Sequence, residues 1–451
     1  KLPLPVGIVG WFFCIGYSFA FFFTGMLPAL GIYTQQWVTQ ANGFLLNFTV
    51  ALRYSSVDKP DDYSHDLVLK LMDEYPGVEE NVDTAKPINI IVVMNESFSD
   101  LTIFDNLEVS QDPTPFLHSL SENTIKGWMY SPVTGGGTAS VEFEYLTGFS
   151  TIFQPPHTVA YQLYTKEGMP SLASLFGVNG YETTAFHPYK SSGWNRPIVY
   201  NNMRFDNQLY QEDVDNAYMI RNYISDQSDY ETIFQITDAE QGDPNFIFNV
   251  TMQNHSGYSV PWTTLPREVW LTGAMKGRFS TVDQYLSLVY QSDRAFEYLV
   301  DYFSRVEEPT MILMYGDHQP QVATNFYTDV LGTAPDTALA QKKQMVPFVL
   351  WANYDIPEAQ GVELSLNYLS ALLMDTANLP MTGYQKYLAR LWKAAPVINT
   401  VGIRDAGGNW YGENEALPEE LEAAVEDYRV LLYNHVFDKK NRVEGFFTLT
   451  E

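Results

Sequence analysis

Ile88-Asn89-Ile90-Ile91-Val92-Val93-Met94 is an almost wholly apolar run rich in β-branched residues, and Asn95-Glu96-Ser97 follows it directly. This composition predicts a strand that is buried on both faces of a parallel sheet. In open α/β sheets, ligands bind at the carboxyl ends of such strands, so Glu96 stands where a functional carboxylate is expected. Taken alone, Glu96 fits a capping or loop role equally well.

A second run of the same design lies far along the chain. Met311-Ile312-Leu313-Met314-Tyr315 predicts another buried strand, and Gly316-Asp317-His318 follows it. Because the carboxyl ends of parallel strands meet at one edge of the sheet, we expect Asp317 and His318 to converge with Glu96. Two carboxylates and an imidazole suit a hard or borderline divalent cation such as Mn²⁺, Mg²⁺ or Zn²⁺.

A glycine-rich turn supplies a hydroxyl for the same site. Thr134-Gly135-Gly136-Gly137-Thr138-Ala139-Ser140 leads into the helical-looking run 140–146. Such a turn exposes backbone N–H groups and the positive end of a helix dipole, which suits a phosphate or sulfate group. Alone, the pattern is more often structural. Together with the two strand-end segments, it makes Thr138 a candidate nucleophile and a fourth metal ligand.

These segments resemble the lipoteichoic acid synthase family, which comprises membrane phosphoglycerol transferases of the alkaline phosphatase/sulfatase superfamily. The motifs that carry the resemblance are Asn95-Glu96-Ser97 after a strand, residues 135–139 opening a helix, and Gly316-Asp317-His318-Gln319-Pro320. The resemblance runs over nearly the whole chain. It implies that Thr138 is the nucleophile and that one Mn²⁺, or else Mg²⁺ or Zn²⁺, binds to Glu96, Thr138, Asp317 and His318.

The family also holds glycerol phosphate with a His-x₆-Trp-x-Arg pattern and a later histidine. The matching positions here are His187, Trp194, Arg196 and His255, and the resemblance makes His255 a catalytic residue as well. The residues alone leave other interpretations open: a turn at His187, surface packing of Trp194 and a surface salt bridge of Arg196. The stretch 139–141 departs from the more polar sequence of many members.

Composition limits the classes of function. The chain has 451 residues, of which 45% are hydrophobic, enough for a large core. A net charge of −28 argues against binding nucleic acid or an anionic membrane surface through bulk electrostatics. The single cysteine, Cys14, excludes disulfides within the chain and a zinc site built on thiolates.

The amino-terminal segment predicts a membrane anchor. No charged residue occurs between Lys1 and Arg53, and residues 6–33 are overwhelmingly apolar. Because about 20 such residues span a bilayer, we expect a transmembrane helix, with a buried core helix as the alternative. Lys1 favours a cytoplasmic start and a catalytic domain outside a bacterial cell membrane, with further spans upstream.

Strand-like and helical runs alternate through the rest of the chain. This alternation predicts an α/β fold with a mostly parallel sheet flanked by helices. The resemblance implies that this sheet is of the sulfatase/alkaline phosphatase-like kind. The expected domains are a transmembrane helix (1–34), a juxtamembrane helical linker (35–84) and an extracellular catalytic domain with a C-terminal subdomain (85–451). The expected strands are 180–185, 245–252, 346–351 and, in the tail, 445–449; the expected helices are 65–75, 281–305, 364–375 and 418–433.

The resemblance implies transfer of glycerol phosphate from phosphatidylglycerol to a growing polyglycerolphosphate (lipoteichoic acid) chain through a covalent threonine intermediate. Alternatives on the same scaffold are a phosphoglycerol or phosphoethanolamine transferase acting on a glycan or lipid, and a sulfatase-type hydrolase. Sulfatases usually need a cysteine or serine processed to formylglycine, which disfavours that alternative at Thr138. The alternative that is not an enzyme is a regulator that binds lipid headgroups.

Overall fold

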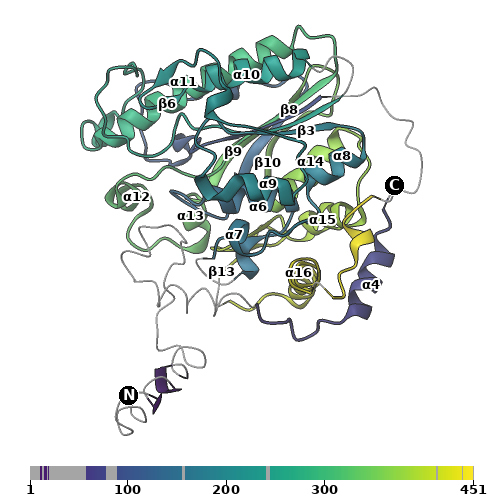
Figure 1. Cartoon of the computed structure of the whole chain (residues 1–451). Helices are drawn as coiled ribbons and strands as arrows, with labels where there is room; N and C mark the ends of the chain where they lie inside the picture. The colour runs from purple at the N-terminus through teal and green to yellow at the C-terminus, as the bar shows by residue number, and fades with distance from the viewer. Residues whose placement is uncertain are drawn as a thin grey trace, which may run out of the picture.

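The computed structural model describes residues 11, 12, 15–17, 19, 57–77, 89–154, 158–239, 244–412, 415–438 and 440–449 (Figure 1). Nowhere in these ranges does a helix combine the length and the apolar composition that crossing a bilayer requires. Most of the predicted transmembrane helix (1–34) and much of the predicted linker (35–84) lie outside the described residues. The domain boundaries and the membrane anchor therefore stay predictions.

An eight-stranded sheet forms the centre of the fold. Five neighbouring strand pairs are parallel, and only β9 runs antiparallel, to both β2 and β8. The expectation of a mostly parallel sheet is therefore confirmed. The order across the sheet is β10 (Ala359–Ser365), β2 (Thr124–Tyr130), β9 (Met345–Ala352), β8 (Thr310–Gly316), β1 (Asn89–Asn95), β7 (Asn245–Val250), β3 (Glu182–Phe186) and β4 (Asn207–Leu209).

Helices bury both faces of this sheet, which explains why its central strands are mostly apolar (Figure 1). In β1, Ile90 and Val92 face one apolar layer, whereas Ile91 and Val93 face the other. The first layer contains α6 (Thr138–Thr147), α8 (Leu172–Val178), α9 (Arg196–Asn202), α14 (Leu369–Thr376), α15 (Gly383–Ala394) and α16 (Glu419–Leu432). The second contains α5 (Pro115–Ser119), α10 (Asp226–Ala239), α11 (Ser280–Phe303) and α12 (Thr324–Leu331).

The triple glycine shapes the entry into α6. Gly135, Gly136 and Gly137 have φ angles of 69°, 142° and 99°, and Gly137 is the N-cap of the helix. Side chains rarely adopt three successive conformations of this kind, so the turn depends on glycine. The helix begins at Thr138, which places this hydroxyl in its first turn.

Two predicted elements differ from the structure. The predicted helix 364–375 is wrong in its first part, because residues up to Ser365 pair with β2 and α14 begins only at Leu369. The predicted strand 445–449 is also wrong. A 3₁₀ turn forms at Glu444–Phe446, and the rings of Phe446 and Phe447 pack against Tyr384 on α15. Aromatic burial against a helix has replaced strand pairing there.

A small second sheet and a helix near the amino terminus complete the fold. A small antiparallel sheet is formed by β11 (Val397–Asn399), β12 (Gly402–Arg404) and β13 (Trp410–Gly412). The backbone N–H of Ile398 in β11 donates to Ser365 Oγ at the end of β10, at 3.1 Å. The predicted helix near the amino terminus is confirmed as α4 (His65–Glu74), which lies against α16 (Figure 1).

His118 on α5 gives a testable pH dependence. Hydrogen bonds to Asp100 (3.1 Å) and Asp112 (2.8 Å) raise the pKa of His118 to about 9. A folded pKa above the unfolded value means that this stabilisation is fully present below pH 6.5 and is lost as the pH rises through 9. In urea unfolding, wild type should therefore exceed His118→Gln in stability at pH 6 but not well above pH 9. A difference that stays constant with pH would contradict the assignment.

Candidate active site

The register of two central strands places the two key carboxylates side by side. β1 and β8 are parallel, with Asn95 aligned on Gly316, so Glu96 and Asp317 follow at equivalent positions. The backbone N–H of Asp317 donates to the carbonyl of Asn95 at 3.2 Å. A Cβ at Gly316 would lie only 1.8 Å from the carbonyl oxygen of Phe98, so the approach of the two loops requires glycine there.

Glu96, Asp317 and His318 form a buried cluster. Their ligand atoms lie within 4.8 Å of one another, and the residues are 4%, 0% and 2% exposed. His318 Nε2 is 3.3 Å from Asp317 Oδ2 and 3.9 Å from Glu96 Oε1. Thr138 Oγ1 donates to Glu96 Oε2 at 3.3 Å. The structure thus brings together all four side chains that the sequence analysis proposed as metal ligands.

The electrostatics of this cluster fit a bound cation. Burial raises the pKa of Asp317, and the charge of Glu96 raises it further. Asp317 Oδ2 and His318 Nε2 are buried and have no hydrogen-bond partner in the part of the chain that is described. His318 Nδ1 donates to the carbonyl of Gln319 at 2.9 Å, which leaves Nε2 free to bind a metal. Two buried carboxylates without an ion would be costly, so the donor set fits a divalent cation.

Neighbouring groups hold these ligands in place. Ser97 donates from its backbone N–H to Asp317 Oδ1 (2.7 Å) and from its hydroxyl to Glu96 Oε1 (3.0 Å). Its φ of 50° is a left-handed conformation that costs of order 1–3 kcal/mol in a non-glycine residue. Thr251 Oγ1 accepts from the N–H of Glu96 at 3.1 Å. The sequence analysis missed Thr251, although it directly follows β7 and the strand-end rule applies to it.

A buried ion pair lies one helical turn beyond Thr138. Glu142 Oε1 accepts from Arg196 Nη2 at 2.6 Å, and Oε2 accepts from Arg196 Nε at 3.3 Å. The hydroxyls of Tyr161 (2.9 Å) and Tyr200 (2.7 Å) also donate to Oε2. Glu142 therefore occupies the edge of the Arg196 guanidinium formed by Nε and Nη2. This pairing fixes the orientation of the third nitrogen of Arg196, Nη1. This partner of the predicted substrate-binding arginine was missed by sequence reasoning.

The two predicted histidines lie near each other at the ends of β3 and β7. His187 Nδ1 donates to the carbonyl of Val250 at 2.8 Å. Burial first, and then the charge of Arg196, hold the pKa of His187 well below its usual value, so the ring is neutral and Nε2 is an acceptor. His255 is half-buried, with Nδ1 3.2 Å from the hydroxyl of Tyr223. The substrate-binding and catalytic roles of His187 and His255 stay predictions.

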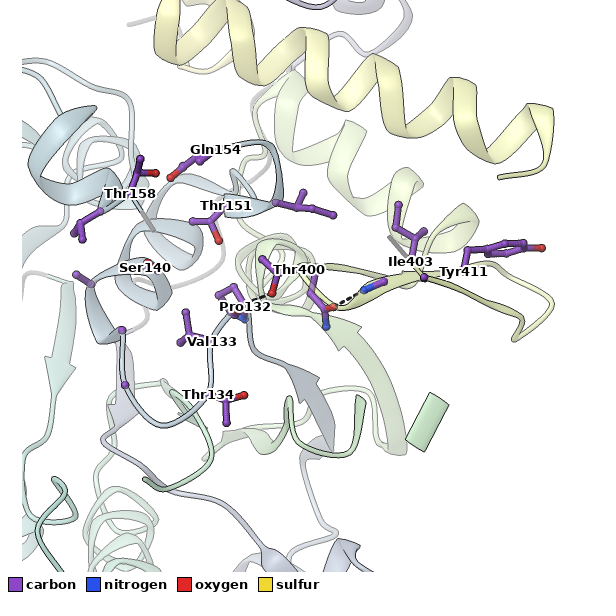
Figure 2. Close-up of a pocket in the computed structure, with 18 of the residues that line it drawn as sticks. Pro132, Val133, Thr134, Ser140, Thr151, Gln154, Thr158, Thr400, Ile403 and Tyr411 are labelled. Atoms are coloured by element: carbon purple, nitrogen blue, oxygen red, sulfur yellow. Dashed lines mark hydrogen bonds between the residues drawn. The ribbon is translucent and has the colours of Figure 1, made fainter. Parts of the chain in front are cut away.

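A pocket of about 720 Å³ lies beside the glycine-rich turn (Figure 2). The turn, the 3₁₀ segment η2 (Thr151–Phe153) and the small β11–β13 sheet form its walls. Trp194 also lines it, held in a turn with a φ of 54°. The predicted substrate-binding tryptophan therefore faces a cavity, and its role in binding remains a prediction.

Comparisons with known proteins agree with this geometry. Residues 88–379 match a protein-family model described as Sulfatase. The chain is 29% identical over 417 residues to a "Putative cyclic beta-1,2-glucan modification protein" of Rhizobium meliloti (strain 1021), covering 90% of this chain. It spans 63% of that relative, less than two thirds of its length.

Solved structures share the fold. Phosphoglycerol transferase GacH of Streptococcus pyogenes, in complex with sn-glycerol-1-phosphate, superposes with a TM-score of 0.70 at 20% identity, covering 88% of this chain and 100% of that one. Lipoteichoic acid synthase LtaP of Listeria monocytogenes gives a TM-score of 0.60 at 17% identity, covering 81% and 96%. The sulfatase/alkaline phosphatase-like fold expected from the motifs is confirmed.

Asp317→Asn tests the metal site without measuring activity. Removal of one buried carboxylate relieves repulsion from Glu96, so the variant should melt at a higher temperature than wild type in EDTA. Wild type should gain about 2.7 kcal/mol of stability when free Mn²⁺ is a hundredfold above its Kd, and the variant should gain little. The exposed control Asp105→Asn should respond to Mn²⁺ like wild type. A full Mn²⁺ response in Asp317→Asn would count against the site.

A matched pair of substitutions on α6 tests the buried ion pair. Glu142→Gln leaves Arg196 buried without its counter-charge and should lower the free energy of unfolding by about 3–5 kcal/mol. Burial raises the pKa of nearby Glu144 to about 7, so Glu144→Gln replaces a group that is already partly protonated at neutral pH. This control should cost no more than about 1.5 kcal/mol in urea unfolding. Equal losses in the two variants would contradict the assignment.

Proposed function

This chain belongs to the sulfatase family, and we propose that it is a metal-dependent phosphoglycerol transferase of the lipoteichoic acid synthase type. The observation that carries the proposal is the position of Thr138. Its hydroxyl lies in the first turn of α6 and contacts Glu96 within the buried Glu96–Asp317–His318 cluster. A hydroxyl at a helix N-terminus beside a cation site has the arrangement required for attack on a phosphoryl group.

Glu96, Thr138, Asp317 and His318 would hold the divalent cation, for which Mn²⁺ is the expectation from the resemblance. When bound, the ion supplies positive charge that lowers the pKa of the Thr138 hydroxyl and neutralises phosphoryl oxygens. The backbone N–H groups of the first turn of α6 point the same way as the helix dipole and attract the phosphate.

The transfer proceeds in two balanced half-reactions. In the first, the Thr138 alkoxide attacks phosphorus, the bond from phosphorus to the diacylglycerol oxygen breaks, and His255 gives that oxygen a proton. In the second, an acceptor hydroxyl returns a proton to His255, its oxygen attacks phosphorus, and the Thr138 alkoxide is released. His255 is our candidate for both steps, because it lies in the segment that follows β7 and its ring is only half-buried.

His187 and Arg196 would hold the glycerol phosphate. The neutral His187 accepts a hydrogen bond from a glycerol hydroxyl at Nε2, because its Nδ1 is committed to Val250. Arg196 offers Nη1 to a phosphate oxygen, because its other edge is committed to Glu142. Both groups reach the substrate in orientations that buried partners have fixed in advance.

The lipid donor and the acceptor define the setting of the reaction. Phosphatidylglycerol leaves a bilayer only at high cost, so the predicted anchor and an extracellular catalytic domain at the bacterial cell membrane fit this donor. The resemblance implies polyglycerolphosphate as acceptor. A glycan hydroxyl is the second candidate, and the 29% identical relative, described as a putative cyclic glucan modification protein, favours it.

Release of diacylglycerol from fluorescent phosphatidylglycerol in the presence of Mn²⁺ tests the nucleophile. Thr138→Ala removes the attacking oxygen and should slow release by about 10³-fold or more, whereas Thr138→Ser should keep part of the rate. The control Thr147→Ala lies at the far end of the same helix and should release diacylglycerol as wild type does. Wild-type rates in Thr138→Ala would refute the mechanism.

A further inference from the structure

We propose that the pocket beside the glycine-rich turn binds a neutral glycan and presents one of its hydroxyls as the acceptor of the phosphoglycerol group. The inference rests on the transfer reaction proposed above and names its second substrate. The pocket is called the acceptor pocket below. It is bounded by the turn, by η2 and by the β11–β13 sheet.

The acceptor pocket lies directly beside the nucleophile. Gly136 and Gly137, which precede Thr138, line it, and so do Ala139 and Ser140, which follow. In Figure 2, Thr151 and Gln154 lie to one side of Thr400, and Ile403 and Tyr411 lie to the other. A molecule seated there meets the first turn of α6, where the covalent intermediate would form.

The charge of the pocket disfavours a polyanion. Among its lining residues that the structure describes there is no Lys, Arg or His, and the single charged residue is Glu415. The chain as a whole has a net charge of −28. A polyglycerolphosphate chain, with one negative charge per repeat, would be repelled by this surface, whereas a neutral glycan would not.

Gln154 supplies a second and independent indication. The residue is 8% exposed, and neither its Nε2 nor its Oε1 has a hydrogen-bond partner among the described residues. Leaving a buried polar group unpaired is unfavourable. Hydroxyl groups both donate and accept hydrogen bonds, so the hydroxyls of a sugar satisfy both ends of the amide.

The remaining walls match a glycan as well. Thr400 Oγ1 donates to the carbonyl of Pro132 at 3.1 Å, so its lone pairs remain for a sugar hydroxyl. Trp194 and Tyr411 add aromatic surface to the same cavity. Tyr411 donates to Asp405 at 3.0 Å, which fixes its ring. Apolar ring faces combined with a few placed hydroxyl and amide groups are the usual lining of a site for a neutral polar ligand.

A competition between two acceptors tests the inference in the full chain. Wild type receives fluorescent phosphatidylglycerol and Mn²⁺ with either cyclic β-1,2-glucan or a short glycerolphosphate oligomer. We expect kcat/KM for the glucan to exceed that for the oligomer by about tenfold or more. Diacylglycerol release with transfer to the oligomer alone would overturn the inference while the proposed function stood. No diacylglycerol release with either acceptor would overturn both.

Gln154→Leu separates binding from a structural role. The variant should raise KM for the glucan by about three- to tenfold, the value of one or two neutral hydrogen bonds, with kcat retained. Its melting temperature should not fall, because the amide has no described protein partner to lose. Gln227→Leu, an exposed position on α10, is the control and should keep the KM of wild type. An unchanged KM in Gln154→Leu, or a fall in both kcat and melting temperature, would overturn the assignment.

Discussion

The in-register pairing of β1 with β8 is the constraint on which the rest of the site depends. It forces Glu96 and Asp317 together in a buried position, where two like charges repel and both lose their hydration. The left-handed backbone at Ser97 stabilises this arrangement, because it places hydrogen-bond donors on both carboxylates. A divalent cation would offset the remaining cost. The unfavourable arrangement of these two charges is therefore one that a bound cation could relieve.

Helix α6 borders two environments that differ in charge: the cluster of ionisable side chains and a largely uncharged pocket. On the metal side, its first turn presents Thr138 to the carboxylate cluster, and Glu142 one turn later orients the guanidinium of Arg196. The same turn also borders a pocket whose one described charged residue is Glu415. Arg196 is therefore the cationic side chain offered to the phosphate of the donor, and neutral hydroxyl and amide groups line the pocket where we place the acceptor. This separation suits an enzyme that passes a charged group to an uncharged recipient.

The sequence predicts those features that depend on local composition. The strands β1 and β8 are buried on both faces, so their apolar runs are readable, and the strand-end rule locates Glu96, Asp317 and His318. No local pattern encodes the pairing of Glu142 with Arg196, because these residues lie on distant segments that meet only in the fold. The burial of the Gln154 amide likewise depends on how distant segments pack. Residues 364 and 365 were misassigned for a related reason. Pairing at the edge of a sheet decides between helix and strand there.

Thr138 is proposed above all to carry the phosphoglycerol group between donor and acceptor. Intact and peptide mass spectrometry of the protein, after incubation with phosphatidylglycerol and Mn²⁺ in the absence of an acceptor, tests this step. We expect a glycerophosphoryl adduct on the peptide that contains Thr138, and its loss when an acceptor is added. Diacylglycerol release without any adduct, or an adduct on another residue, would contradict it.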